Sequence, residues 1–206
     1  MKKTITDILN DAGIKNVGFC AFNDVKENLL ECRAKSRIPQ NAKTIIICAF
    51  PYKVKSSQPK LLSRYAAVPD YHIVVKKFLE RACYNLFQKY PQNKFECFCD
   101  NSPIPEVHTA ALAGLGVKGD NGLLITKEYG SFVFLGEIVT DLQIECKNLY
   151  AECNHCGNCE NTCPVTLKKE KCLSNLSQKK KLLPEELEKL KTNEILWGCD
   201  ICQNNC

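Results

Sequence analysis

The sequence lacks any apolar run that approaches the roughly 20 residues a helix needs to cross a bilayer. Residues 1–13 are charged and amphipathic, and they contain no apolar core of the kind that a secretory signal peptide carries. The first absence predicts that the chain is not inserted in a membrane. The second predicts the cytoplasm, where thiols stay reduced.

Two common nucleotide-binding signatures are also missing. There is no Walker-type phosphate loop, and the run Gly114-x-Gly116-x-x-Gly119 follows an expected helix rather than a strand, so it predicts a turn. The net charge of +5 is modest for a nucleic-acid-binding protein. Lysines do gather at residues 168–169 and 179–181. Such runs are usually a solvated face, and here they could also form a phosphate-facing patch.

Cysteine is abundant, with 15 residues, of which eight lie in the last quarter of the chain. They form one run with the spacing Cys-x2-Cys-x2-Cys-x3-Cys-Pro, one isolated cysteine, and one run with the spacing Cys-x2-Cys-x3-Cys. The first run has the spacing with which bacterial ferredoxins hold 4Fe-4S clusters, the fourth cysteine reaching a neighbouring cluster.

Eight thiolates make two complete sets of four cluster ligands. Three cysteines at x2 spacing can wrap one cluster in a tight loop, whereas the fourth, which precedes Pro164, points away to the second cluster. The sequence therefore predicts a first cluster held by Cys153, Cys156, Cys159 and Cys206, and a second held by Cys163, Cys172, Cys199 and Cys202. We interpret the protein as one that moves electrons singly.

Zinc is the competing interpretation, because Cys-x2-Cys pairs also build zinc ribbons, and His155 inside the first run could be a further ligand. A zinc site needs only four ligands and has no use for the long first run, so we favour clusters. Disulfides would require an oxidising compartment, which the N-terminus does not indicate.

The other seven cysteines show no ligand spacing. Cys48 lies in the apolar run 44–50, where a thiol behaves as a small hydrophobic side chain. Cys97 and Cys99 alternate along a strand-like stretch, residues 94–100, so we expect them either in the core or on the wall of a cofactor pocket.

Helical and strand periodicities follow one another along the first 140 residues, which predicts an α/β or α+β arrangement. We expect helices at about residues 4–12, 24–35, 71–90, 106–115 and 185–191, and strands at 17–22, 44–50, 94–100, 123–126 and 131–140. Residues 1–145 are expected to form an α/β domain for cofactor and substrate, and residues 146–206 a two-cluster ferredoxin-like domain. Because a simple electron carrier does not need the first domain, we expect an electron acceptor there or on another protein.

Several motifs in the first domain resemble the epoxyqueuosine reductase family. They are Arg64-Tyr65, Asp70-Tyr71-His72, Asp100-Asn101-Ser102-Pro103 with Glu106, Ala113-Gly114-Leu115-Gly116, and the stretch 130–138, which reads Gly-Ser-Phe-Val-Phe-Leu-Gly-Glu-Ile. The two cysteine runs follow in the family's order. The similarity covers nearly the whole chain, and its specific part is the combination of these motifs with the ferredoxin-type cysteines.

The resemblance implies a cobalamin-dependent reductase with two 4Fe-4S clusters, which converts epoxyqueuosine in the wobble position of tRNA to queuosine. It implies an α+β protein whose N-terminal α/β domain binds cobalamin base-off and whose small bis-4Fe-4S module follows. Its partners would be tRNA and a reduced donor such as a flavodoxin or ferredoxin, and it would act as a monomer.

The resemblance also implies roles for single residues. Asp100 would be the catalytic proton donor, whereas from the residues alone the better interpretation is a turn residue that caps the next helix. A carboxyl group in a dry pocket keeps its proton to higher pH, which suits protonation of a departing epoxide oxygen. Arg64, Tyr71 and His72 are expected in the cobalamin pocket, and Cys97 on its wall. Glu137 would be costly to bury unpaired and is expected to hold a backbone turn.

Three departures from the family pattern leave alternatives open. Residues 116–121 lack the family's tryptophan and carry Asp120 where a lysine is usual, and a segment near residues 37–39 is missing. The sequence stops at Cys206, where the family continues into a helical region implicated in tRNA binding, so the resemblance is to a short form. A corrinoid reductase of a small electrophile, such as an organohalide, and an electron-transfer protein without corrinoid both remain open.

Overall fold

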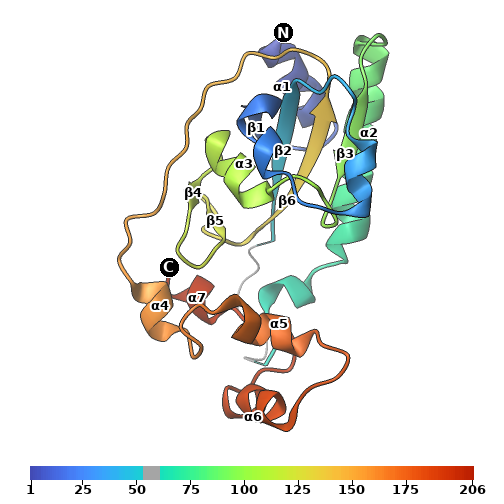
Figure 1. Ribbon diagram of the computed structural model, residues 1–206. Coiled ribbons are helices and arrows are strands. Elements are labelled where there is room, and N and C mark those ends of the chain that lie inside the picture. The colour runs from blue at the N-terminus through green and yellow to red at the C-terminus, as the bar shows by residue number, and fades with distance from the viewer. Residues whose placement is uncertain (53–60) are drawn as a thin grey trace.

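A four-stranded antiparallel sheet lies at the centre of the computed structural model, which describes residues 1–52 and 61–206 (Figure 1). Its spatial order is β1-β2-β6-β3, and β2 pairs with β6 along its whole length. The strands are β1 (Asn16–Ala21), β2 (Thr44–Pro51), β3 (Phe95–Phe98) and β6 (Val133–Thr140). A separate two-stranded ribbon contains β4 (Val117–Lys118) and β5 (Leu124–Ile125).

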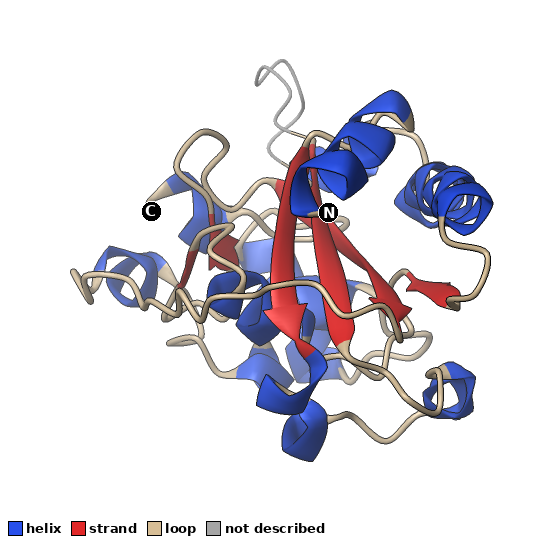
Figure 2. Ribbon diagram, turned by 90° about the horizontal axis from the view of Figure 1, so that it is seen from above, coloured by secondary structure: helices blue, strands red, loops and turns tan. Residues whose placement is uncertain are grey.

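Helices cover both faces of the sheet (Figure 2). On one face, α1 (Lys2–Asp11) and α2 (Tyr71–Lys89) pack against Ile46 and Ile138. On the other face, Ile45, Ile47 and Val139 pack against α3 (Glu106–Leu112) and residues 22–34. Because β2 is buried on both faces, its sequence is continuously apolar rather than alternating.

The ends of the two long helices follow the sequence signals. Gly13 comes just after α1 and has a φ of +90°, a left-handed conformation that glycine adopts without strain. At the start of α2, the carboxylate of Asp70 accepts a hydrogen bond of 2.9 Å from the backbone N–H of His72. The helix ends two residues before Pro91. Leu79, at 0% exposure between α2 and the sheet, contributes about 2 kcal/mol through burial.

The prediction of a helix at residues 24–35 is wrong. That stretch contains three short 3-10 turns, η1 (Phe22–Asp24), η2 (Lys26–Asn28) and η3 (Arg33–Arg37). The backbone N–H of Leu30 donates to the carbonyl of Pro103 at 2.8 Å, on the loop that follows β3. A tertiary hydrogen bond thus replaces the intrahelical one that the apolar spacing predicted.

The C-terminal quarter consists of short helices that lie together beyond one end of the sheet (Figure 1). They are α4 (Asn158–Thr162), η5 (Lys169–Lys171), α5 (Leu173–Ser177), α6 (Pro184–Thr192) and α7 (Ile201–Asn204). Their buried core comprises little more than Leu173, Leu176 and Leu190. Residues 142–152 reach this quarter as an extended segment along the outside of the sheet layer (Figure 1).

Polar contacts attach this quarter to the sheet end where β2 stops and β6 starts. The backbone N–H of Arg64, in η4 (Arg64–Ala67), donates to Asp200 Oδ2 at 2.7 Å. Ser131 Oγ donates to Gln203 Oε1 at 3.1 Å, and the N–H of Ser63 donates to the carbonyl of Trp197 at 2.9 Å. The division of the chain at residue 145 stays a prediction. None of the helices in the described ranges is both long and apolar enough to cross a membrane.

Candidate active site

Asp100 follows β3 by two residues, after the strand ends at Phe98 opposite Glu137 of β6. Its φ of +65° is left-handed, which costs a residue with a side chain about 1 kcal/mol or more. The turn is closed by a hydrogen bond from the N–H of Ser102 to the carbonyl of Asp100. Strained backbone of this kind persists where the surroundings enforce it, and it often marks a functional residue.

Two side chains from the start of α2 hold the Asp100 carboxylate. Tyr71 donates its hydroxyl hydrogen to Asp100 Oδ1 at 3.0 Å, and His72 Nε2 lies 3.3 Å from Asp100 Oδ2. The other ring nitrogen of His72, Nδ1, lies 2.7 Å from Asp70 Oδ1. Burial lowers the pKa of His72, but its hydrogen bonds to Asp70 and Asp100 outweigh this and raise it.

The contacts of His72 with Asp70 and Asp100 would use two ring N–H groups. Both ring nitrogens of His72 face carboxyl oxygens, yet a neutral imidazole carries only one N–H. The raised pKa of His72 favours the imidazolium, which has an N–H for each of the two carboxylates. A proton is then held beside Asp100, which suits the role of proton donor.

The expectation that Asp100 sits in a dry pocket is wrong. Its side chain is 56% exposed, because it projects from a turn at the sheet end. Two glutamates near Asp100 are buried instead. Glu106, the first residue of α3, and Glu137, on β6, are both withdrawn from water, Glu137 completely.

Glu106 and Glu137 form a buried pair of carboxyl groups. Burial, helped by the charge of Asp100, raises the pKa of Glu106 to about 7. Burial, followed by the charge of Glu106, raises the pKa of Glu137 well above its ordinary value. Ser102 Oγ donates to Glu137 Oε1 and accepts from the N–H of Ile104 at 3.0 Å. Glu137 therefore fixes the loop that carries Asp100, as the sequence predicted for a backbone turn.

Two cavities share the rings of Tyr71 and Phe134, and Asp100 lines one of them. One, of about 250 Å³, is lined by Asp100, Glu106 and Leu123 among others. The second, of about 310 Å³, is lined almost entirely by apolar and aromatic side chains. The rings of Tyr52, Phe134 and Tyr71 stack in sequence, with centroids 4.3 Å apart at each contact.

A third cavity lies among the cysteines of the C-terminal quarter. It measures about 390 Å³, and its wall includes the thiols of Cys163, Cys172, Cys199 and Cys202. Burial and the charges of the other three cysteines raise the pKa of Cys202 to about 11. Four thiolates ionised together in this cavity would need a metal centre to compensate their charge. Leu123 lines this cavity and also the smaller Asp100 cavity, so the two are neighbours.

The remaining four cysteines of the two runs also gather. Burial first, and then the charges of Cys159, Cys156 and Cys153, raise the pKa of Cys206. The structure thus brings together the same two groups of four that the spacing predicts. The donor sets and the cavity fit two 4Fe-4S clusters, and the individual ligand roles stay a prediction.

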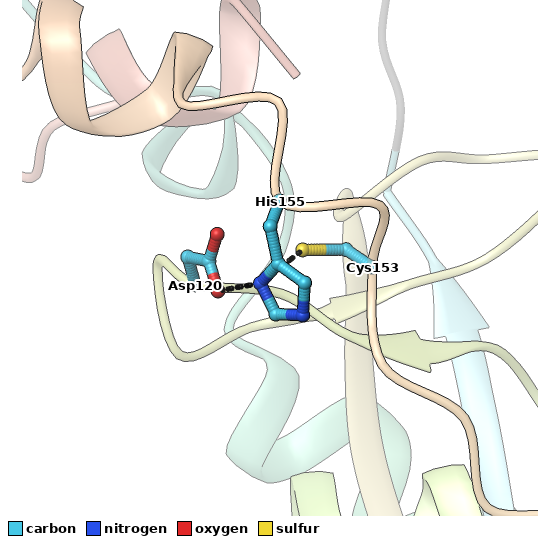
Figure 3. A group of neighbouring side chains, drawn as sticks. All are labelled: Asp120, Cys153 and His155. Carbon is cyan, nitrogen blue, oxygen red and sulfur yellow. Dashed lines mark hydrogen bonds and ion pairs between the residues drawn. The ribbon is translucent and has the colours of Figure 1, made fainter.

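His155, the candidate zinc ligand, contacts Asp120 and Cys153 (Figure 3). Its Nδ1 lies 2.8 Å from Asp120 Oδ1 and 4.0 Å from Cys153 Sγ. Cys153 belongs to the first group of four thiols, so a zinc ion here would take one of the predicted cluster ligands. Asp120, which the sequence marked only as a departure from the family, instead ties the turn between β4 and β5 to the loop of the first cysteine run.

Two other predicted cofactor residues lie elsewhere. Arg64 donates from Nη2 to Asn204 Oδ1 at 2.8 Å, and its guanidinium lies 4.3 Å from the centroid of the Phe132 ring. Cys97 packs against the α2 side of the sheet, where a hydrogen bond with Cys83 lowers its pKa. Their cofactor roles, like those of Tyr71 and His72, stay predictions.

Sequence reasoning missed Leu123 and gave Glu106 no role. Leu123 carries no chemical signal, because its importance comes only from the two cavities that it separates. Glu106 was visible as part of the Asp100 motif, six residues further on, but nothing in the sequence paired it with Glu137.

Comparison with known proteins places this geometry in a family. The family model described as "Epoxyqueuosine reductase QueG, DUF1730" matches residues 33–101. An epoxyqueuosine reductase of Lactococcus garvieae is 31% identical over 243 aligned positions, which take in the whole chain and 69% of that protein. The chain belongs to the epoxyqueuosine reductase family.

Solved structures agree with this assignment. The epoxyqueuosine reductase of Streptococcus thermophilus matches with a TM-score of 0.84 at 27% identity, over all of this chain and 65% of that one. An epoxyqueuosine reductase with an epoxyqueuosine-modified tRNA-Tyr stem loop has the same fold, with a TM-score of 0.83 at 24% identity over 64% of its length. The chain spans about two thirds of the length of these epoxyqueuosine reductases. The resemblance and the α+β class are confirmed.

The buried glutamates predict a specific dependence of stability on pH. Because their pKa values are raised on folding, the folded protein keeps protons that the unfolded chain releases above about pH 4.5. The free energy of unfolding should therefore fall as the pH rises from about 5 to about 8, by up to about 1.4 kcal/mol per pH unit for each proton retained. Glu137→Gln removes one such group, so its melting temperature should fall less steeply.

Thermal unfolding followed by circular dichroism, on cluster-loaded protein under anaerobic conditions, checks this. Glu145→Gln, at an exposed position, is the matched control and should follow the parent chain at every pH. Parallel curves for Glu137→Gln and the parent would contradict the retained proton.

Proposed function

We propose that this protein reduces epoxyqueuosine in tRNA to queuosine, using two 4Fe-4S clusters in residues 146–206 and a cobalamin held beside Asp100. The observation that carries the proposal is that Leu123 lines both the Asp100 cavity and the cavity among the cysteines. A redox cofactor in the Asp100 cavity would be next to that carboxyl group and would also be a neighbour of the cavity lined by four cysteines.

The side chains around Asp100 fit a large, flat, partly apolar cofactor. The two cavities are continuous in their lining through Tyr71 and Phe134, and the larger one is almost entirely apolar. Aromatic faces suit contact with a macrocycle, and Asp100 is the polar group at the edge of this surface. When bound, cobalamin would supply a strongly reducing cobalt centre, and the clusters would replenish its electrons one at a time.

The protein's own residues would supply the proton and orient the carboxyl group that donates it. Asp100 would donate its proton to the epoxide oxygen as the carbon–oxygen bond breaks, since a protonated oxygen departs far more readily. Tyr71 and His72 hold the two oxygens of Asp100, so the carboxyl group presents a fixed orientation to the substrate. Phe134 and Leu123 would keep water away from the reacting atoms.

The substrate class is supported by the family. A solved epoxyqueuosine reductase with this fold contains an epoxyqueuosine-modified tRNA-Tyr stem loop. On this chain, lysines at 168–169 and 179–181 lie in the same quarter as the clusters, although Lys179 is paired with Glu186 at 2.6 Å. These lysines would contact phosphates of the stem loop, and a reduced flavodoxin or ferredoxin would serve as electron donor.

An anaerobic titration of the cluster-reconstituted protein with cobalamin tests the proposal. We expect saturation near one equivalent, with the absorbance change that marks loss of the lower axial base. Phe134→Ala removes an aromatic wall from both cavities and should raise the Kd about tenfold, equivalent to about 1.4 kcal/mol. Tyr84→Ala is the control, because Tyr84 is 64% exposed on α2.

Binding should be followed by reduction of an epoxyqueuosine-modified stem-loop RNA. Intact clusters with no cobalamin binding would leave an electron carrier as the better description. Cobalamin binding without reduction of the RNA would point to a smaller electrophile.

A further inference from the structure

Removal of the epoxide oxygen from epoxyqueuosine needs more protons than Asp100 can hold. The oxygen leaves as water and a carbon–carbon double bond remains, so the epoxide takes up two electrons and two protons. The clusters and their donor would supply the electrons. Asp100 has one carboxyl group and delivers one proton, so a second must reach the same place within one turnover.

We propose that Glu106 and Glu137 share a proton and pass it to Asp100, which makes the pair the store for the second proton of the reaction. The inference rests on the proposed function for its substrate. Glu106 is the transferring group, because it lines the cavity that contains Asp100, and Glu137 is the buried partner that holds the proton with it.

The hydrogen bonds of the pair are incomplete without such a proton. Glu106 Oε1 and Glu137 Oε2 are both buried, and neither receives a hydrogen from any donor in residues 1–52 or 61–206. The two carboxyl groups are close enough for the charge of Glu106 to raise the pKa of Glu137. Two ionised carboxylates repel at this range, whereas one proton between them gives each an interaction partner.

The surroundings favour retention of that proton. The groups whose charges act on the pair are Asp100, Tyr71, Cys48, Cys97 and Cys99, from four different segments of the chain. Each of these is neutral or negative, so none offsets the charge of a fully ionised pair. The transfer would restore the proton of the Asp100 carboxyl group. It would leave both glutamates ionised until solvent reprotonates the pair.

The position of the pair also suits transfer. Ser102 lies two residues after Asp100, and its hydroxyl donates to Glu137, so the loop with the donor is bonded to the store. The cavity of about 250 Å³ between Glu106 and Asp100 has room for a bridging water, which needs only about 15 Å³. One water is a sufficient bridge for a proton transfer.

His72 is the competing source of the second proton. Its ring lies 3.3 Å from Asp100, and at 52% side-chain exposure it can exchange protons with solvent. A supply through His72 alone would not involve the buried pair. The test must therefore separate the two routes.

Infrared spectroscopy of the resting, cluster-loaded protein tests the shared proton without substrate. We expect the carbonyl stretch of a protonated carboxyl group at pH 7, shifted in deuterated water, and retained in Asp100→Asn. It should shift in frequency in Glu106→Gln and in Glu137→Gln, because each change leaves the remaining carboxyl group beside an amide in place of a carboxylate. Absence of the band, or its loss in Asp100→Asn with an unshifted band in Glu106→Gln, would overturn the shared proton.

Single-turnover reduction of the modified stem-loop RNA tests the supply. Glu106→Gln should slow product formation about tenfold or more at pH 8 and less at pH 6, because solvent protons replace the missing store at lower pH. Glu106→Asp should restore part of the rate, and Glu145→Gln, at an exposed position, should match the parent. A pH profile of Glu106→Gln parallel to the parent, with His72→Asn alone changing its shape, would assign the supply to His72.

The infrared and single-turnover experiments together distinguish failure of the shared-proton inference from failure of the proposed function. A parent protein with the infrared band but without RNA reduction would overturn the substrate and not the shared proton. A parent protein that reduces the RNA and lacks the band would overturn the shared proton and leave the function intact.

Discussion

Asp100→Asn should lower the rate of epoxide reduction by a factor of about 10² to 10⁴, the usual effect of removing a positioned general acid. Asparagine keeps the size of the side chain and an oxygen that can accept the hydrogen bond from Tyr71, so the turn after β3 should persist. It has no acidic proton to give to the departing oxygen. Single-turnover kinetics with the modified stem-loop RNA measure the loss.

Two comparisons make this result specific. The cluster content of Asp100→Asn should equal that of the parent, because the change lies outside the cysteine groups. Asp70→Asn should have a smaller effect on the rate, since Asp70 reaches Asp100 only through His72 and an asparagine can still cap α2. A rate for Asp100→Asn within about twofold of the parent would remove Asp100 from the chemistry.

Cys199→Ala should remove the second cluster and loosen the C-terminal quarter. Iron content should fall from about eight to about four atoms per chain if each group of four thiolates holds one cluster. The effect on structure should be large because the core of this quarter is small, and metal centres supply folding energy to such modules. Iron and sulfide analysis, with hydrogen exchange of residues 158–206, measures both effects.

The chain offers a matched control for this change. Cys83→Ala alters a thiol on α2 that faces Cys97, far in sequence from either group, and should leave iron content unchanged. Zinc in place of iron and sulfide in the parent protein would revive the zinc interpretation. Loss of iron on Cys83→Ala would mean that the spacing had selected the wrong ligands.

The proximity of the cysteines within each run could be predicted because ferredoxin-type spacing is largely local. Three ligands within seven residues can surround one cube only in a few ways, so spacing carries the geometry. The long helix from Tyr71 was equally readable, with Asp70 at its start and Pro91 beyond its end. In both cases neighbouring residues determine the structure.

The pairing of Glu106 with Glu137 could not be read from the sequence because it depends on strand register. Phe98 of β3 stands opposite Glu137 of β6, which brings the loop after β3 over that carboxyl group. A slip of one residue would turn Glu137 to the α2 face. The expected helix at 24–35 failed for a related reason, since the contact of Leu30 with Pro103 joins segments about seventy residues apart.

The polar attachment of α7 to the start of β6 has a consequence for biogenesis. The sheet layer has its own apolar core on both faces, whereas the C-terminal quarter joins it through hydrogen bonds of Arg64, Ser131 and Asp200. We therefore expect that the sheet can fold before iron is delivered, and that iron starvation would leave a precursor whose sheet is folded and whose cysteine quarter is less ordered.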